Sequence, residues 1–339
     1  MYATDAVAQH KHFRSGAMKR PEFESIFKGE INAFIDAKVA AGFQERSFAI
    51  WFKVFDSFCR ESHLGAPVFT RRLADEWCKR RKHEATTTHY SRVNAVKHFL
   101  SYLQKRGYDV CVTRDVSFKK TLFQPHIYTK DETQRYFRAV DTCNFKKNKK
   151  CALQYPVLFR LLYCCGTRID ETLKIRKKDI DIEAGIIKLV EVKNNSERFV
   201  VLGEDLLSLV KRFADKCFYL LGDEDYIFTS AIGDRCCYET IYDHHRLFLK
   251  LASIPYIGNS EGPRIHDWRH TFAVNSFRQM VDAGMDMYVA LPVLSTYLGH
   301  KTIFATEGYV RLTMAMYPYI EQKFKTKLNE VFGCGGTYQ

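Results

Sequence analysis

The 339-residue chain lacks several features that would place it in particular classes of protein. It has no charged-then-apolar segment typical of a signal peptide, and no apolar run long enough to span a bilayer. None of its eleven cysteines is spaced as CxxC, so the common zinc and dithiol motifs are absent. Internal repeats and low-complexity tracts are also missing. We therefore expect a cytoplasmic protein with reduced, mostly buried thiols and no membrane partner.

Basic residues are in excess. The formal net charge is +13, and hydrophobic residues make up 46% of the sequence, enough to build packed cores in two domains. Up to residue 125 there are 22 Lys and Arg against 13 Asp and Glu, whereas the remainder has 30 against 26. Concentrated positive charge is typical of proteins that bind a polyanion, because Lys and Arg displace the counterions of phosphates. A basic surface that serves only solubility remains the alternative.

Apolar periodicity predicts helices through the first third of the chain. Helical spacing starts at Pro21, and further helices are expected over 46–62, 70–82 and 87–105. The pattern lapses after Gly107, which indicates a linker.

The following part opens at a Thr129–Glu132 capping box, continues with a helix over 151–165, and contains a hairpin of two strands, 186–192 and 198–202. The expected organisation is a flexible arm at 1–20, a helical domain at 21–107, a linker at 108–126, a mixed α/β domain at 127–332 and a flexible tail at 333–339.

The helices expected over 70–82 and 87–105 are the basic ones. Their Lys, Arg, Thr and His side chains alternate with apolar anchors such as Leu73 and Trp77, an arrangement that suits a helix lying against duplex DNA. Solvated helix faces share this pattern, so a plain exposed surface is the alternative. The predicted DNA-contacting residues are Arg71, Arg72, Lys79, Arg80, Arg81, Lys82, Thr87, His89, Arg92 and Lys97.

The stretch GTRIDE places an arginine at the start of another helix. Thr167 is expected to cap this helix with Asp170 three residues further on, which would put Arg168 in the first turn. Free amide hydrogens there already favour an anion, so an arginine at this position is suited to grip a phosphate. A surface arginine in a charged helix is the alternative.

Two histidines and an arginine share one helix face in the stretch HDWRH. Helical spacing aligns His266, Arg269 and His270, while Trp268 and Phe272 form an aromatic stripe on roughly the opposite face. The two histidines are spaced as in metal-binding helices, but the acidic residue of HExxH is missing and Arg269 would repel a cation. The pattern therefore predicts a polar face directed into a site without metal.

The stretch LGHKTIFATEGYV adds a histidine and a tyrosine. A helix is expected to end at Leu298-Gly299, with His300 in the turn and Tyr309 after a short further helix. A tyrosine hydroxyl is a weak nucleophile that needs cations around a phosphate and a nearby base or acid. Lys193, at the tip of the hairpin, is placed to protonate a leaving oxygen. Together these residues suit metal-free attack on a phosphodiester.

In this order the motifs resemble those of the tyrosine recombinases, the phage integrase family. The shared elements are an arginine in GTRIDE, a lysine on a hairpin, HxxRH, LGH, and a tyrosine nine residues after that histidine, and the resemblance covers about residues 20–325. It implies a mainly α protein with a small β-sheet, in which a helical, SAM-like core-binding domain precedes a mixed α/β catalytic domain. It also implies a site-specific DNA recombinase or integrase that cuts and rejoins double-stranded DNA through a 3′-phosphotyrosyl intermediate, without metal, ATP or other cofactor.

Carried over by position, the resemblance gives the principal residues their roles. Tyr309 would attack the scissile phosphate, and Lys193 would protonate the departing 5′ oxygen. The nonbridging oxygens would be held by Arg168, Arg269 and His300.

Three further residues would support these groups. His266 would assist proton transfer at the tyrosine, Glu171 would support the first arginine, and His270 would lie just behind the site. Trp268 departs from the family, which commonly has leucine there, and is expected to enlarge a packing contact.

Some of these residue roles, and the function itself, have alternatives. Lys188 lies on the same hairpin as Lys193, and Tyr317 and Tyr319 are alternative nucleophiles at a poorer distance from His300. A type IB topoisomerase-like relaxing enzyme would share the chemistry without needing paired sites. A DNA-binding regulator with a decayed site is disfavoured, because every expected catalytic residue type is present.

The resemblance also implies an assembly. The family works as a tetramer on two DNA duplexes, so we expect a nucleoid-associated homo-tetramer, acting alone or with a partner recombinase. A helix within 314–332 would dock onto a neighbouring subunit or pack in its own chain. The sequence LPVLSTYLGH resembles the corresponding stretch in recombinases of mobile genetic elements.

Overall fold

Two compact units make up the chain, Met1–Phe123 and Gln124–Gln339. The computed structural model describes residues 20–117, 124–145, 149–191, 196–258, 262–300, 302, 304–320 and 322. The boundary between the units falls inside the predicted linker, whereas the predicted arm, apart from residue 20, and the predicted tail lie outside the described residues. The described ranges are mainly α-helical with one small sheet, which confirms the predicted fold class.

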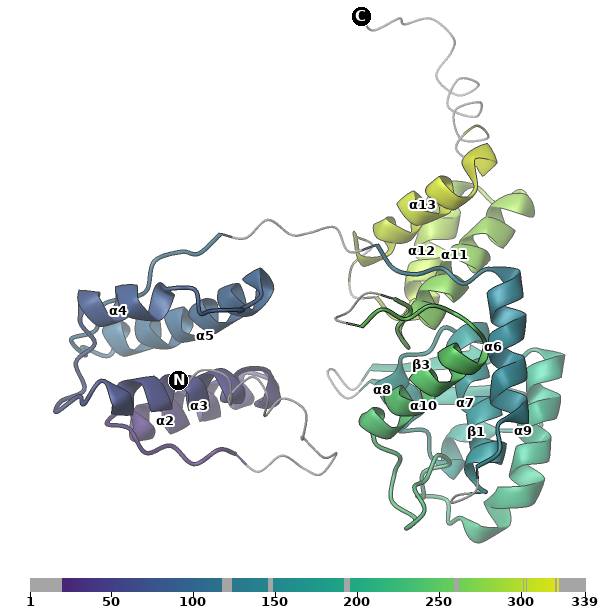
Figure 1. Cartoon of the computed structure of the whole chain (residues 1–339), viewed down its shortest axis with the longest axis horizontal. Coiled ribbons are helices and arrows are strands. Elements are labelled where there is room, and N and C mark those ends of the chain that lie inside the picture. Colours follow the sequence, from purple (N-terminus) through teal and green to yellow (C-terminus); the bar gives the residue numbers. More distant parts are fainter. Residues whose placement is uncertain are drawn as a thin grey trace, which may run out of the picture. The chain divides into compact units, whose positions relative to one another are not determined.

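The first unit is a helical body around an aromatic core (Figure 1). Phe34, Phe52 and Phe99 meet edge to face, with ring centroids 5.4 to 5.6 Å apart. Rings favour this arrangement because the positive edge of one meets the negative face of the next. The helices are α2 Lys28–Ala40, α3 Arg46–Glu61, α4 Arg71–Cys78 and α5 Thr86–Lys105.

The first helix begins later than apolar spacing predicts. The spacing starts at Pro21, but α2 begins at Lys28. The Asp56 carboxylate on α3 accepts hydrogen bonds from the backbone amides of Glu24 and Ser25, at 3.0 and 2.8 Å. These bonds hold the preceding segment against α3 in a non-helical course, a contact between residues more than thirty apart that local spacing does not reveal.

The first unit also extends further along the chain than predicted. Val110 lies within the predicted linker, yet it is buried and forms a parallel bridge with Phe69. Thr113 is buried as well. The chain therefore leaves this unit after Thr113 and not at Gly107.

One residue predicted to contact DNA, Arg92, is buried inside the first unit. Its guanidinium donates to both carboxylate oxygens of Glu84, at 2.7 and 3.0 Å, and to the carbonyl oxygens of Trp77 and Lys79. The predicted phosphate contact of Arg92 is therefore wrong, because its charge and its donors are used within the protein. These same bonds stop α4 at Cys78, although the sequence pattern predicts a helix to residue 82.

The predicted DNA contact of His89 is wrong for a related reason. Its ring is buried, with Nε2 2.9 Å from the carbonyl oxygen of Cys78. At helical spacing, His89 and Arg92 fall on the same side of α5 as the core residues Val93 and Val96. Both side chains therefore face inward, where they stabilise the loop between α4 and α5.

The second unit follows the predicted order of elements. Its first helix starts at the predicted capping box, where Thr129 Oγ1 accepts from the Glu132 amide and the Glu132 carboxylate accepts from the Thr129 amide. The elements are α6 Lys130–Thr142, α7 Cys151–Cys164, α8 Ile169–Thr172, η2 Lys177–Asp179, β1 Ile180–Asp181, β2 Ile186–Glu191, β3 Ser196–Val201, α9 Glu204–Cys217, η3 Phe218–Leu220, α10 Tyr238–Leu251, α11 Asp267–Asp282, α12 Met287–Leu298 and α13 Phe304–Met316.

The sheet has the order β1-β2-β3, with antiparallel neighbours, and it contains the predicted hairpin. Ile187 lies opposite Val200 and Leu189 opposite Arg198. Ile187, Leu189 and Val200 are buried, so Arg198 shares the sheet face that packs on the core. An arginine on such a face requires a partner inside the protein.

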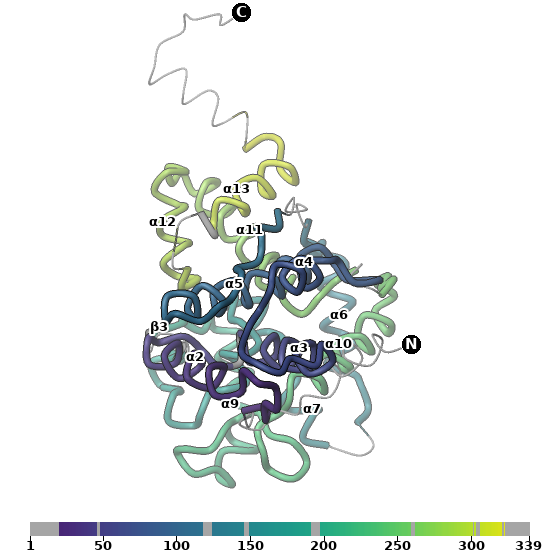
Figure 2. The backbone as a smooth tube through the Cα atoms, turned by 90° about the vertical axis from the view of Figure 1, so that its left-hand side faces the viewer, coloured from purple at the N-terminus to yellow at the C-terminus, as the bar shows by residue number. Residues whose placement is uncertain are grey.

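Helices α11, α12 and α13 group together at one end of the second unit (Figures 1 and 2). The predicted aromatic stripe of α11 anchors this group, because Trp268 stacks on Tyr128 with ring centroids 3.7 Å apart and Phe272 stacks on Tyr297. Trp268 is fully buried against Tyr128. The opposite face of α11 is therefore directed away from this aromatic contact.

The segment after α13 overlaps the stretch 314–332, in which a docking helix is predicted. Ile320 is fully buried in the same cluster as Tyr309, so this part packs within its own chain. The apolar residues Phe324, Leu328 and Val331 lie outside the described residues.

Two further observations concern the described residues alone. No helix among them is both long and apolar enough to cross a membrane. Every cysteine that the structure describes is a free thiol.

Replacing Arg92 tests the role assigned to it here. Arg92→Ala leaves the buried Glu84 carboxylate without its counter-charge, so we expect the free energy of unfolding to fall by about 3–5 kcal/mol. Urea denaturation followed by tryptophan fluorescence measures this change. The exposed Arg72→Ala serves as control and should stay within about 0.5 kcal/mol of the unmodified protein. Equal stabilities for both variants would contradict the buried assignment.

Candidate active site

The turn between α7 and α8 lets two distant segments meet. Gly166 has a φ of +58°, and a Cβ added there would lie 2.3 Å from Cδ1 of Phe272 on α11. Only glycine fits this approach. As a result, the Gly166 carbonyl oxygen lies 2.6 Å from Nη1 of Arg269.

Arg168 occupies the N-cap of α8, in extended backbone conformation. Its amide donates to the Glu171 carboxylate at 2.9 Å, and its guanidinium Nη1 donates to the same carboxylate. The expected cap by Thr167 with Asp170 is therefore wrong: Glu171 caps the helix, and Thr167 Oγ1 instead contacts Thr172 Oγ1 at 2.6 Å. The Glu171 carboxylate thus orients the Arg168 side chain.

Arg269 is 1% exposed and lies at the centre of the site. Its Nη2 donates to the Leu298 carbonyl oxygen at 2.6 Å and to His300 Nε2 at 3.1 Å. Burial and the neighbouring charge of Arg168 lower the pKa of Arg269 to about 10, so it stays charged at neutral pH.

These contacts decide the tautomer of His300. A guanidinium has only donors, so His300 Nε2 accepts and the ring proton must be on Nδ1, which donates to Thr306 Oγ1 at 2.7 Å. Burial and the charges of Arg269 and Arg168 lower the pKa of His300 to about 4. Gly299, in the left-handed conformation at φ 65°, ends α12 and turns the chain toward this position, as the sequence predicts.

Tyr309 lies inside α13, and not after a short helix as predicted. Its ring is 5% exposed and stacks on His300, with centroids 6.0 Å apart and an interplanar angle of 12°. Burial raises the pKa of the Tyr309 hydroxyl, while the charges of Arg269 and Arg168 act in the opposite direction. The structure thus brings together Tyr309, His300 and two arginines from three separate segments.

The two HDWRH histidines lie beside this group. Their rings meet edge to face, with centroids 4.7 Å apart, and His270 is 5.4 Å from the Tyr309 ring. His266 lies at the solvent-facing rim. Crowding by protein atoms lowers the pKa of His266 to about 4, with Arg269 and Arg264 adding to the effect. Burial, with the nearby His266, lowers the pKa of His270 to about 3.

The competing candidates that the structure describes make their contacts elsewhere, and one candidate cannot be placed. Lys193 lies outside the described residues. Lys188 forms an ion pair with Glu197 on the neighbouring strand, at 2.8 Å. Tyr317 packs against the Arg278 guanidinium, and Tyr319 donates to the Asp282 carboxylate at 3.0 Å. The alternative tyrosines therefore engage α11 at residues away from Arg269 and His300.

Sequence reasoning missed one residue of this site, Arg198 on β3. Its Nη2 donates to Glu171 at 2.7 Å and its Nη1 to the Tyr297 carbonyl oxygen at 3.0 Å. Burial alone would raise the pKa of Glu171, but Arg198 and Arg168 hold it below its usual value. The available signal was an arginine at a core-facing position of an alternating strand.

The residues of the first unit that are predicted to contact DNA differ in how exposed they are. Besides the buried Arg92 and His89, Arg81 is half-buried over the Trp77 ring and Lys97 is half-buried beside Asp115. The exposed members are Arg71, Arg72, Lys79, Arg80, Lys82 and Thr87. Their ion pairs with neighbouring carboxylates, such as Arg71 with Asp75 and Lys79 with Glu76, are surface pairs of little net stability, so a phosphate can replace the carboxylate.

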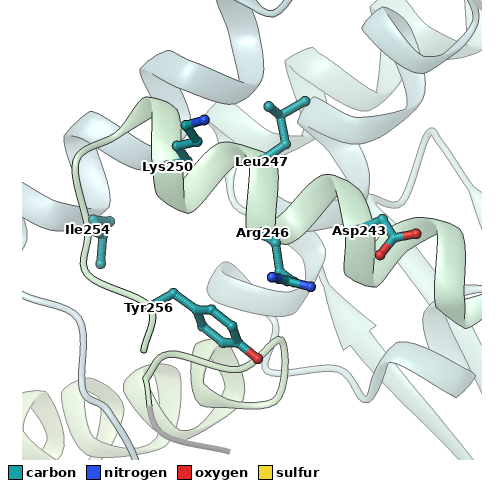
Figure 3. A pocket seen from close by; sticks show the side chains of 6 residues that line it. All are labelled: Asp243, Arg246, Leu247, Lys250, Ile254 and Tyr256. Atoms are coloured by element: carbon teal, nitrogen blue, oxygen red, sulfur yellow. The ribbon is translucent and has the colours of Figure 1, made fainter. Parts of the chain in front are cut away.

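A hollow of about 430 Å³ lies beside α10 (Figure 3). It contains none of the catalytic candidates, and its charges are mixed, since Asp243 lies along the same helix as Arg246 and Lys250. Within the described part of the chain, no group of three or more His, Cys, Asp or Glu side chains is arranged to hold a metal ion.

Comparison with known proteins identifies relatives of this chain. Residues 127–316 match the model of the phage integrase family. The chain is 27% identical over 297 residues to a putative integrase/recombinase of Sinorhizobium fredii, covering 84% of this chain and 93% of that protein. It is also 27% identical over 197 residues to tyrosine recombinase XerC of Staphylococcus epidermidis, covering 58% and 60%.

Solved structures share the fold. The XerH site-specific recombinase bound to palindromic difH substrate aligns with a TM-score of 0.62 at 16% identity, over 86% of this chain and 79% of that one. A lambda integrase dimer bound to a COC′ core site aligns with a TM-score of 0.54 at 16% identity, over 81% and 95%.

The fold and the site define a DNA strand-exchange enzyme. The chain belongs to the phage integrase family, the tyrosine recombinases, and is therefore a site-specific DNA recombinase.

The buried histidines predict a pH dependence of stability. The pKa values of His245, His270 and His300 are lowered to between about 3 and about 4, mainly by burial. Between their usual pKa near 6.5 and pH 4, the unfolded chain therefore binds protons that the folded chain does not. The free energy of unfolding should fall as the pH falls from about 7 to 5.

Urea denaturation at pH 7, 6 and 5 measures this dependence. His270→Gln should reduce the fall, because it removes one of the contributing groups, whereas His98→Gln, at an exposed position of the first unit, should not change it. A stability that is constant across this range would show that the histidines have the same pKa values in the folded and the unfolded chain.

Proposed function

We propose that the protein cuts and rejoins double-stranded DNA through a 3′-phosphotyrosyl intermediate on Tyr309, without metal or ATP. The observation that carries this proposal is the convergence of Arg168, Arg269 and His300 around the buried Tyr309. A cluster of cations beside a tyrosine is the arrangement that stabilises charge on a phosphate under attack. Membership of the family supports the same reading.

The proposed step balances as a transesterification. The Tyr309 oxygen forms a bond to the scissile phosphorus, and the bond from phosphorus to the 5′ oxygen breaks. His266, neutral at pH 7, assists removal of the phenolic proton, and Lys193 protonates the departing oxygen. Because a phosphodiester is exchanged for a phosphotyrosyl ester, a 5′-hydroxyl can reverse the step without external energy.

The two arginines and His300 have a different task. Arg168, Arg269 and His300 contact the nonbridging oxygens of the phosphate in this proposal. In the free protein, His300 Nδ1 carries the ring proton and donates it to Thr306 Oγ1, and Nε2 accepts from Arg269. Donation by His300 to a phosphate oxygen therefore requires Nε2 to gain a proton, which the negative charge of the phosphate favours.

DNA binding by the first unit completes the proposal. The exposed residues Arg71, Arg72, Lys79, Arg80, Lys82 and Thr87, with the half-buried Arg81 and Lys97, contact the DNA backbone. The working form is a homo-tetramer on two DNA sites, acting alone or with a partner recombinase, in association with the nucleoid. A mobile genetic element is the proposed setting.

Replacing the nucleophile tests the chemistry. Short duplexes from the DNA flanking the gene, each with a nick that traps cleavage, are incubated with protein in EDTA and without ATP. Tyr309→Phe should abolish the covalent protein–DNA adduct because the attacking oxygen is gone. Tyr317→Phe is the matched control and should retain it. Peptide mapping that places the phosphotyrosine on Tyr317 or Tyr319 would overturn the assignment.

Salt dependence tests the DNA-binding surface. Arg72→Ala combined with Lys82→Ala removes two exposed cations, so the slope of log affinity against log salt should fall by up to about 2. Lys28→Ala combined with Lys105→Ala removes the same charge from exposed positions outside the predicted set and should leave the slope unchanged. Fluorescence anisotropy at several salt concentrations measures both. Equal slopes in the two double variants would remove Arg72 and Lys82 from the interface.

A further inference from the structure

The carboxyl end of α12 is held by three arginines from different segments. Three successive carbonyl oxygens there each accept from a separate guanidinium: Tyr297 from Arg198 at 3.0 Å, Leu298 from Arg269 at 2.6 Å, and Gly299 from Arg168 at 3.1 Å. The last carbonyls of a helix lack partners within the helix and carry partial negative charge, so they attract cations.

Arg198 connects this helix end to the helix that carries Arg168. One arm of its guanidinium donates to Tyr297, and the other donates to Glu171 at 2.7 Å. Glu171 in turn accepts from the amide and the guanidinium of Arg168. The side chains are 14% and 6% exposed for Arg198 and Glu171, so water offers little replacement for these bonds.

The neighbouring turn is shaped around Arg198. A Cβ added at Gly299 would lie 3.0 Å from Cδ of Arg198, so the stem of the arginine packs directly against the turn that precedes His300. His300 follows Gly299 in the chain, and its amide donates to the Ser295 carbonyl oxygen of α12. A shift of this helix end would therefore move His300 together with the carbonyls that hold Arg168 and Arg269.

We propose that Arg198 is a positioning residue for DNA cleavage: by bridging Glu171 and the Tyr297 carbonyl, it holds Arg168 and the His300 turn where they contact the scissile phosphate. This inference rests on the proposed function. Arg198 does not itself touch the reacting atoms. Its effect is transmitted through Glu171 to Arg168, and through the end of α12 to His300.

The bridge requires a guanidinium. Its planar fork presents two donors in different directions at a fixed separation, whereas the lysine ammonium is a single centre on a flexible stem. Arg198→Lys keeps the charge but cannot hold Glu171 and Tyr297 in the same geometry. Arg198→Gln removes the charge as well, and leaves Glu171 with Arg168 as its remaining arginine partner.

The experiment separates binding from cleavage. Nicked duplexes are used to measure DNA affinity and the single-turnover rate of covalent adduct formation for the unmodified chain, Arg198→Lys and Arg198→Gln. We expect affinities within about twofold, and cleavage rates lowered about tenfold for lysine and about 100-fold for glutamine, because misplacement of about 1 Å in a catalytic group has effects of this order. Arg160→Lys alters another arginine–carboxylate pair, more exposed and between Arg160 of α7 and Asp141 of α6, and should leave the rate unchanged.

A neutral substrate distinguishes positioning from general loss of structure. When a methylphosphonate replaces the scissile phosphate, one nonbridging oxygen and its charge are absent, so correct placement of Arg168 matters less. The ratio of unmodified to Arg198→Gln rates should therefore fall toward one on this substrate. A defect of equal size on both substrates, or rates equal to the unmodified chain, would overturn the proposal. Absence of any adduct from the unmodified chain would instead refute the proposed function.

Discussion

Mutual repulsion among closely spaced guanidinium groups is the constraint on which this site depends. Arg168, Arg198 and Arg269 converge at one helix end, and the Glu171 carboxylate lies between Arg168 and Arg198. The positive charge is offset by Glu171 and by the carbonyl dipoles at the end of α12, and the imbalance that remains favours an anion. In the proposed function a DNA phosphate supplies the missing negative charge, so the geometry of the free protein already suits that ligand.

The same field controls the protonation of the residues around it. Burial and the nearby arginines keep His300 neutral well below pH 7, and its tautomer is set by Arg269, which can only donate. Crowding by protein atoms and the charges of Arg269 and Arg264 lower the pKa of the rim residue His266 to about 4. Neutral histidines can accept protons at physiological pH, which a catalyst of tyrosine attack needs. The arginines also oppose the effect of burial on the Tyr309 hydroxyl. In the proposed reaction, phosphate binding and proton transfer are therefore linked through one electrostatic environment.

Pairing with a buried carboxylate gives two arginines tasks that their sequence surroundings do not indicate. Arg92 lies among the basic residues of the first unit, yet its charge is neutralised by Glu84 and its donors close the end of α4. Arg198 lies on a strand without a recognisable motif, yet it joins the catalytic cluster through Glu171. In both cases the partner carboxylate is buried, so the pair organises a loop or a helix end and does not serve as a surface charge.

Local patterns in the sequence determined the capping box at Thr129, the hairpin and the residue types of the site. They also determined the helices of the first third, apart from the start of α2 and the end of α4. These features depend on neighbours within a few positions, where spacing is informative. Contacts between distant segments decided the rest: Asp56 delays α2, Glu171 replaces Thr167 as the cap, Arg92 and His89 turn inward, and Arg198 enters the site. Whether a charged side chain faces solvent or a buried partner depends on which residue the fold brings opposite it. Apolar periodicity along one segment does not identify that partner, because the partner lies in a distant part of the sequence.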